Sequence, residues 1–423
     1  MTEPDHSLAA SVDNHGWRVT FAGMGINLAL GVLYTWSVFK KNIPADWGWQ
    51  DLTLWPYAVA CLVFCLVMVP AGRMQDRLGP RLVATIGGVL VGIGMIIASL
   101  TTSLAGYIVG FGLLAGAGIG FGYASATPPA VKWFPAAKTG LIAGLVVSGF
   151  GLASVYIAPL AAYLIQTFGV GTTVMAFGIG FLVVVCGLAQ LLKPPPPGYV
   201  PAGTPAPKAN NGPAKKEEFT PGEMLRTWQF YLLWFMYACG AGAGLMIIGI
   251  LADMAKKQAG VDLGFILVAA LAIGNGAGRI GAGILSDKIG RKASMFICFV
   301  MQAVLIFLIS MATKGSAFAS TPILTLISAL VGANYGANLS LFPSATKDYY
   351  GLKNFGMNYG LVFTAWGIGG FALSVVASFV RKATNSFNFA YYCSAALLVL
   401  AAVAAFLFKA PHHVEHDAEP AEA

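Results

Sequence analysis

Long apolar runs separated by short polar turns dominate this chain, and their length predicts the fold class. A helix that crosses a membrane needs about 20 mostly apolar residues, and twelve runs of about that length are present. They cover residues 17–39, 53–74, 83–101, 106–131, 139–165, 171–192, 228–252, 263–285, 293–313, 321–345, 355–379 and 387–408. The pattern predicts an all-α membrane protein with twelve transmembrane helices.

The polar segments divide these helices six and six. The longest begins K-P-P-P-P-G-Y and is rich in Pro, Gly, Lys and Glu, a composition typical of a flexible linker. His412, His413 and His416 near the C-terminus could bind a metal, although a solvated tail is the simpler interpretation. We therefore expect an N-terminal tail, a six-helix bundle, a linker, a second six-helix bundle and a C-terminal tail over residues 1–16, 17–192, 193–226, 227–409 and 410–423.

Composition and charge agree with a membrane protein. Of the 423 residues, 57% are hydrophobic and only 10% are charged, against about 25% charged in soluble domains. The net charge of +8 raises the question of a nucleic-acid partner. With both termini placed in the cytoplasm, however, 17 of the 25 Lys and Arg residues fall in cytoplasmic segments and 7 in external ones. This bias follows the positive-inside rule. The excess of basic over acidic residues therefore reflects the membrane topology and predicts no nucleic-acid partner.

Neither a signal peptide nor a cofactor is expected. Residues 1–16 are polar, which does not fit a cleaved signal peptide. The six cysteines all fall inside apolar runs without zinc or disulfide spacing. No nucleophile–base pair or paired carboxylates occur within the runs, so an enzyme is not predicted either.

A charged turn occurs twice, which predicts two related halves. G-I-L-S-D-K-I-G-R-K at 283–292 has a degenerate copy, G-R-M-Q-D-R-L-G-P-R, 211 residues upstream at 72–81. Glycines repeat too, since Gly140, Gly144 and Gly151 recur 216 residues later as Gly356, Gly360 and Gly367. Repeated halves are typical of carriers that open alternately to each side. We expect the charged residues of the turns to form a conformational latch, or simply to anchor helix ends; they are Asp76, Arg77, Asp287 and Arg291.

Arg279 is the one basic residue deep inside a predicted span, away from its ends. It lies eight residues before Asp287, which at ~1.5 Å per residue puts it about 12 Å into a hydrocarbon core about 15 Å deep to its midplane. A charge there costs at least ~2.5–3.5 kcal/mol. No Asp or Glu of the sequence lies at matching depth, and no histidine lies in any span. A transported carboxylate is therefore the predicted partner, because guanidinium binds it through two hydrogen bonds. The alternative is a structural arginine bonded to helix carbonyls or tyrosine hydroxyls.

Several further residues are candidates for the substrate pocket. Asn275 lies one helical turn before Arg279, where it could bond Arg279 or a substrate hydroxyl, or join two helices. Tyrosines combine an apolar ring with a polar tip, and each of those chosen could instead be a packing residue. The remaining candidates are Tyr34, Tyr123, Tyr335, Tyr359 and Asn334 as polar lining, and Leu28 and Leu145 as an apolar wall.

These motifs resemble a known family. The doubled G-x-x-x-D-[RK]-x-G-[RK]-[RK] turn resembles the signature of the major facilitator superfamily. Three further features resemble the oxalate:formate antiporter and monocarboxylate transporter branch of that superfamily. They are the segment G-V-L-Y-T-W-S-V-F at 31–39, the segment Y-x4-P-P-x2-K-W-F at 123–134, and Arg279. The resemblance covers residues 17–409. The resemblance implies transport of small organic anions, with Arg279 holding the carboxylate. It also implies an aromatic box formed by Tyr34, Tyr123, Tyr335 and Tyr359.

Two departures from the family pattern refine this expectation. Oxalate carriers have a lysine in helix 11, whereas the run 355–379 has no Lys or Arg and Val362 takes that place. One cation suits a monocarboxylate better than a dianion, because an unpaired charge in a low-dielectric site is costly. Lactate carriers also have an acid one turn before the arginine and a lysine in helix 1, and here Asn275 replaces the acid and no lysine precedes Lys40.

The sequence thus predicts a proton-linked carrier of lactate-like monocarboxylates, working as a single copy in a bacterial inner membrane with both termini cytoplasmic. Protons would move with the carboxylate itself or through an unidentified relay. The alternative is a carboxylate:carboxylate antiporter that needs no protons. A carboxylate sensor is disfavoured because the linker is too short for an output domain.

Overall fold

The computed structural model describes residues 14–202, 218–260, 264–384 and 386–411, and every regular element in these ranges is helical. Most of the two predicted tails, the middle of the predicted linker, and the histidines 412, 413 and 416 lie outside the described residues. The all-α prediction is confirmed.

The first half of the chain forms one bundle of helices. It contains α1 (Gly16–Leu30) continued by η2 (Gly31–Thr35) and α2 (Trp36–Lys41), α3 (Leu54–Leu78), α4 (Pro80–Ser99), α5 (Leu104–Tyr107) continued by η5 (Ile108–Ala115) and α6 (Gly116–Lys132), and α7 (Thr139–Ala189). Short 3-10 turns η3 (Ala45–Trp47), η4 (Gln50–Leu52) and η6 (Ala136–Lys138) lie between them.

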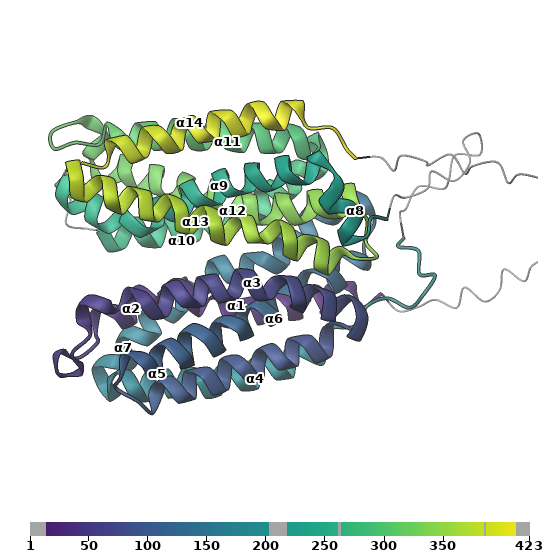
Figure 1. The fold of residues 1–423 in the computed structure, drawn as a ribbon, viewed down its shortest axis with the longest axis horizontal. Helices are drawn as coiled ribbons and strands as arrows, with labels where there is room; N and C mark the ends of the chain where they lie inside the picture. Colours follow the sequence, from purple (N-terminus) through teal and green to yellow (C-terminus); the bar gives the residue numbers. More distant parts are fainter. Residues whose placement is uncertain (1–13, 203–217, 261–263, 385, 412–423) are drawn as a thin grey trace, which may run out of the picture.

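The second half forms the other bundle. It contains α8 (Pro221–Arg226), α9 (Trp228–Met254) continued by η7 (Ala255–Ala259), α10 (Gly264–Ile289), α11 (Arg291–Ser310), η8 (Ala317–Ala319), α12 (Thr321–Tyr350), α13 (Phe355–Thr384) and α14 (Asn388–Leu407). The two bundles lie side by side, coloured purple to blue and teal to yellow in Figure 1.

Twelve membrane-crossing helices are present, as predicted. Eleven helices of the described chain are long and apolar enough to cross a membrane. One of them, α7, has 51 residues and contains two of the predicted spans, because Gly169 interrupts it with φ of +81°. Glycine adopts this left-handed backbone conformation without the steric cost that a Cβ atom brings.

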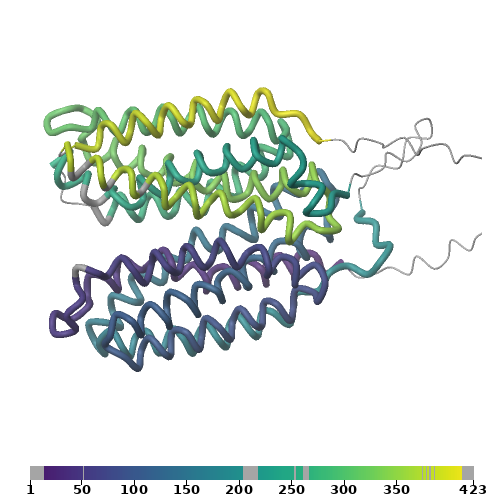
Figure 2. Tube along the Cα trace, viewed as in Figure 1, coloured from purple at the N-terminus to yellow at the C-terminus, as the bar shows by residue number. Residues whose placement is uncertain are grey.

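The start of α1, the short helix α8 and the end of α14 all lie at one end of the molecule, which we call the linker end (Figure 1). The chain that follows α7 leaves the first bundle at this end, and α8 joins the second bundle there (Figure 2). The repeated turns also lie at this end, where Gly79 (φ +88°) separates α3 from α4 and Gly290 (φ +89°) separates α10 from α11.

The predicted linker is more ordered than its composition implied. Phe219 is only 2% exposed, donates its backbone N–H to the carbonyl of Tyr350, and accepts a bond from the side chain of Asn358. α8 begins with a capping box between Thr220 and Glu223. The expectation of a uniformly flexible linker is therefore wrong for residues 218–226, because its few apolar side chains dock on the second bundle.

Candidate functional site

A small cavity lies between the two bundles and is enclosed by side chains from both. The space between these side chains is too small to hold a water molecule, so the site is closed in this conformation. Its lining combines one cation with a largely aromatic wall. The lining residues are Tyr34, Phe64, Tyr123 and Phe150 from the first half, and Arg279, Leu339, Phe363 and Trp366 from the second. Three of the residues predicted from sequence, Tyr34, Tyr123 and Arg279, therefore meet at one cavity.

Arg279 in α10 is completely buried, and its guanidinium is only partly bonded. Its Nε donates to Oδ1 of Asn275 at 3.1 Å, and Nη1 donates to the backbone carbonyl of Val147 in α7. Its Nη2 is buried without a hydrogen-bond partner. Within the described part of the chain, no Asp or Glu forms an ion pair with this arginine. The site thus presents a buried cation with one uncommitted nitrogen.

The position of Arg279 depends on glycines in the facing helix. A Cβ atom at Gly144 of α7 would lie 2.3 Å from the backbone oxygen of Arg279, and one at Gly151 would lie 3.1 Å from its Nε. Cβ atoms essentially never approach backbone atoms closer than 3.0 Å. The two glycines therefore allow α7 and α10 to come close enough for the bond between Arg279 and Val147.

The predicted aromatic residues of the two halves also meet. The hydroxyls of Tyr34 and Tyr335 lie 2.6 Å apart, and Nε1 of Trp366 donates to the Tyr335 hydroxyl at 2.9 Å. Tyr34 lies in the 3-10 segment η2, where the first transmembrane helix changes its winding. A 3-10 stretch inside a longer helix often marks a hinge or a functional position. These bonds connect η2 of the first half with α12 and α13 of the second.

Not every predicted site residue reaches the cavity. Tyr359 is buried in α13 and packs on Phe363, with a hydroxyl that has no partner. Asn334 in α12 donates to the carbonyl of Leu330 in its own helix, and its side-chain oxygen has no partner. Leu28 and Leu145 are half-buried and are not among the side chains that enclose the cavity.

Sequence reasoning missed most of the aromatic wall and a third tyrosine. Phe64, Phe150, Phe363 and Trp366 enclose the cavity, yet aromatic residues are common in every apolar run. Tyr237 of α9 is completely buried, stacks on Phe342 with ring centroids 4.1 Å apart, and has no partner for its hydroxyl. A tyrosine inside an apolar run was the only available signal.

The predicted latch residues lie at the linker end, between the halves. The carboxylate of Asp287, in the last turn of α10, accepts the backbone N–H groups of Gly140 and Leu141 at the start of α7, both at 2.8 Å. Asp76 in α3 accepts those of Gly356 and Met357 at the start of α13, at 3.0 and 2.9 Å. Each acid satisfies free amides at a helix N-terminus of the other half, where the helix dipole also favours a negative charge.

The arginines of the two turns differ. Arg291 pairs with Asp287 and with Asp348 of α12, each at 2.8 Å, and also bonds Ser286. Arg77 is exposed and forms no ion pair with a described residue. An ion pair between the acid and the arginine of the turn is therefore found in the second half, while in the first half the carboxylate bonds backbone N–H groups alone.

The described residues give no sign of a metal site, since no three His, Cys, Asp or Glu side chains among them are grouped closely enough to hold an ion.

Comparison with known proteins agrees with this architecture. A family model described as the Major Facilitator Superfamily matches residues 44–266 and 233–423. An Escherichia coli (strain K12) protein named "Uncharacterized MFS-type transporter YhjX" is 30% identical over 357 residues, covering 84% of this chain and 85% of that protein. The oxalate:formate antiporter of Oxalobacter formigenes is 26% identical over 373 residues, covering 86% of this chain and 85% of that protein.

Other matches are partial or structural. Monocarboxylate transporter 11 of Mus musculus is 30% identical over 183 residues, 42% of this chain and 40% of that protein. The crystal structure of the transporter FucP in the outward conformation superposes with a TM-score of 0.66 at 15% identity, covering 92% of this chain and 99% of that chain. At this identity the structural match shows the fold alone.

Proposed function

Because this chain belongs to the Major Facilitator Superfamily, whose members are carriers rather than enzymes, we propose that it transports small monocarboxylates such as L-lactate and that Arg279 binds the carboxylate. One observation carries the proposal. Arg279 is a fully buried cation with no acidic partner among the described residues and with one nitrogen, Nη2, that has no hydrogen-bond partner. A buried charge in this state is costly, and a carboxylate would both neutralise it and accept the free N–H groups.

The lining of the cavity supports a substrate with a single negative charge. The space between the lining side chains is too small even for a water molecule, so a substrate can enter only when the halves move apart. Arg279 is the one cation among the side chains that enclose it, and buried Val362 occupies the helix 11 position where oxalate carriers have a lysine. A dianion would enter with one charge unpaired, which predicts a preference for monocarboxylates over oxalate.

We further propose that the linker end faces the cytoplasm, in keeping with the excess of Lys and Arg there. The described conformation is then closed on the cytoplasmic side by the contacts of Asp76 and Asp287. Transport would require these contacts to open, and the bond between Tyr34 and Tyr335 to break and re-form around the substrate. No Asp or Glu among the described residues pairs with Arg279, so a coupled proton would travel with the substrate or through a relay outside this site.

The test is uptake of labelled L-lactate into proteoliposomes that contain the wild type or Arg279→Ala. We expect the variant to insert normally and to lose at least about 100-fold in uptake, because a hydrogen-bonded charge pair with one partner removed loses ~3–5 kcal/mol. Arg279→Lys keeps the charge but not the planar fork, so it should recover only part of the activity. Arg18→Ala, at an exposed arginine of α1, is the matched control and should transport like the wild type. Wild-type uptake by Arg279→Ala would overturn the proposal.

The 26% identity to an oxalate:formate antiporter over most of both chains keeps exchange as the second candidate function. Two conditions separate the candidates. Accumulation of lactate driven by an acid-outside pH gradient would establish proton symport. Exchange of internal for external carboxylate that ignores the gradient would establish antiport.

A further inference from the structure

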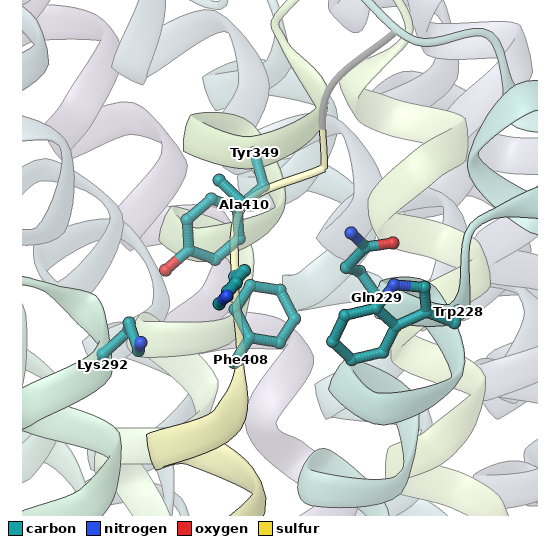
Figure 3. Close-up of a pocket in the computed structure, with 7 residues that line it drawn as sticks. Trp228, Gln229, Lys292, Tyr349, Phe408 and Ala410 are labelled. Carbon is teal, nitrogen blue, oxygen red and sulfur yellow. The ribbon is translucent and has the colours of Figure 1, made fainter. Parts of the chain in front are cut away.

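A second, larger pocket opens at the linker end of the second bundle, away from the cavity around Arg279. It has a volume of about 670 Å³. Its lining mixes two lysines with aromatic and amide side chains, several of which are drawn in Figure 3. The lining residues are Trp228, Gln229, Lys292, Tyr349, Phe408, Lys409 and Ala410.

The pocket lies where four membrane-crossing helices begin or end. Trp228 begins α9, Lys292 is the second residue of α11, Tyr349 is the penultimate residue of α12, and Phe408 and Lys409 follow the end of α14. These are the boundaries of the candidate membrane spans. A pocket at this level faces the headgroup layer of one leaflet rather than the hydrocarbon core or bulk water.

The charge of the pocket is positive and unbalanced among the described side chains. Lys292 and Lys409 are exposed and form no ion pair with a described residue. The nearest acid in the sequence, Asp348, is already paired with Arg291 at 2.8 Å and lies 4.0 Å from Lys347. Two free ammonium groups at one pocket favour a phosphate group, which accepts hydrogen bonds from both.

The surroundings favour a lipid as the source of that phosphate. The floor of the pocket is aromatic, with Tyr349 packed on Phe408 at 4.9 Å between ring centroids. Beside it, Trp228, Phe406 and Leu407 are 55%, 67% and 64% exposed, an apolar surface of the kind that acyl chains cover. Tryptophan is typical of the membrane interface, and basic pockets between transmembrane helices bind anionic headgroups.

We propose that this pocket is a binding site for an anionic phospholipid, with Lys292 and Lys409 holding the headgroup phosphate and the exposed face of α14 and Trp228 contacting the acyl chains. Lys292 directly follows Arg291, which pairs with the latch carboxylate of Asp287. A headgroup on Lys292 would therefore lie next to the contact that joins the two halves. The proposal does not depend on which solute the protein transports.

The first test measures binding of phosphatidylglycerol against phosphatidylcholine to the purified full-length protein by native mass spectrometry. We expect the wild type to prefer phosphatidylglycerol. Replacing both lysines (Lys292→Gln with Lys409→Gln) should reduce that preference about 30-fold, since each lysine near a membrane surface contributes roughly fivefold. The matched control is Lys40→Gln with Lys41→Gln, two exposed lysines at the opposite end of the protein. An equal loss in both double variants, or no loss in the first, would overturn the proposal.

The second test locates the lipid through tryptophan fluorescence in vesicles that contain brominated lipid, which quenches tryptophans in contact with it. Brominated phosphatidylglycerol should quench the wild type more than brominated phosphatidylcholine does, and Trp228→Phe should remove that difference. Trp17→Phe, at another exposed tryptophan of the linker end, should keep it. A difference that survives Trp228→Phe would place the lipid elsewhere and overturn the assignment.

Two other occupants are outcomes of the same experiments. If millimolar inorganic phosphate abolishes the preference for phosphatidylglycerol, the pocket is a site for soluble phosphate and the lipid proposal is wrong. The acidic chain end that follows Pro411 could also cover the lysines. Removing residues 412–423 should leave lipid binding unchanged, and selective binding that appears only after this truncation would show that the tail is the occupant.

Discussion

At the scale of single residues, the hydroxyls of the buried tyrosines fall into two groups. The Tyr34 hydroxyl is bonded to Tyr335 across the two halves at 2.6 Å, whereas the Tyr237 hydroxyl is buried near that of Tyr359 but forms no hydrogen bond of normal geometry. Losing a hydrogen bond costs about 0.5–1.5 kcal/mol, and an unpaired buried hydroxyl itself costs about 1–3 kcal/mol. We therefore predict that Tyr34→Phe lowers the substrate-free unfolding temperature, while Tyr237→Phe leaves it unchanged or raises it.

Thermal unfolding in detergent measures both effects. Tyr163→Phe, at a tyrosine that is 64% exposed, is the control for the loss of a hydroxyl and should not shift the transition. If Tyr237→Phe proved as destabilising as Tyr34→Phe, the hydroxyl of Tyr237 would have a hydrogen-bond partner, such as a buried water, that stabilises the fold.

The sequence alone singled out Arg279 as a candidate but could not show which groups hold its guanidinium. Arg279 stood out because a cation within a membrane span is energetically costly and is usually functional. Its bond to the carbonyl of Val147 could not be foreseen, because that bond depends on how closely α7 approaches. The two interpretations of Arg279, a substrate ligand or a residue bonded to a helix carbonyl, prove compatible, since Nη1 has a carbonyl partner and Nη2 has none.

At the scale of helices, glycines set the separation between the halves. The repeated glycines that the sequence pairs by a shift of 216 residues make equivalent contacts. Gly140 faces the carbonyl of Gly283, and Gly356 faces that of Gly72, so that an added Cβ would lie 2.3 and 2.5 Å from these oxygens. The repeat thus predicted helix contacts that the structure contains.

We predict that Gly144→Ala forces α7 and α10 apart. Its Cβ would lie 2.3 Å from the backbone oxygen of Arg279, and overpacking of this kind costs about 1–3 kcal/mol. The unfolding temperature and the apparent affinity for the substrate should both fall. Gly180→Ala lies in the same element with no atom within 4 Å of the new Cβ, and should be neutral or stabilising by about 0.5–1 kcal/mol. Equal effects of the two substitutions would mean that helix propensity, not packing, determines the result.

Local departures from α-helical winding were beyond sequence reasoning. The 3-10 segment Gly31–Thr35 and the π-helical segment Ile108–Ala115 lie inside runs that read as continuous apolar helix. Their apolar pattern does not distinguish them from the α-helix on either side. The break at Gly169 was located correctly to a few residues by the boundary between the fifth and sixth runs, because a polar or glycine-rich turn leaves a gap in hydropathy.

At the scale of the whole molecule, the two halves are related but unequal at the linker end. The shift of 211 residues that relates Asp287 to Asp76 relates Arg291 to Pro80. As a result Asp287 accepts three bonds, from Gly140, Leu141 and Arg291, whereas Asp76 accepts two backbone bonds. The degenerate copy of the motif therefore encodes a weaker version of the same contact.

This inequality predicts that the halves separate more readily when the second-half contact is removed. In Asp287→Asn the single side-chain oxygen can accept fewer of the hydrogen bonds that Gly140, Leu141 and Arg291 donate to the carboxylate. The new amide group also turns its own N–H donors toward these donors, which is unfavourable. Each hydrogen bond to a charged group contributes on the order of 1.5–3 kcal/mol, so the closed linker end should lose more stability than in Asp76→Asn. The effect should appear as a larger open population in the absence of substrate.

Distances between spin labels at residues 73 and 288, which are exposed at the linker end of opposite halves, report this population. In a cysteine-free background, the wild type should give mainly the short distance, Asp76→Asn a partial long component and Asp287→Asn a larger one. Asp46→Asn, at an exposed acid of the opposite end, should match the wild type. A larger long-distance component in Asp76→Asn than in Asp287→Asn would contradict this prediction. It would show that Arg291 does not strengthen the contact of Asp287, and that the contact of Asp76 closes the linker end more strongly.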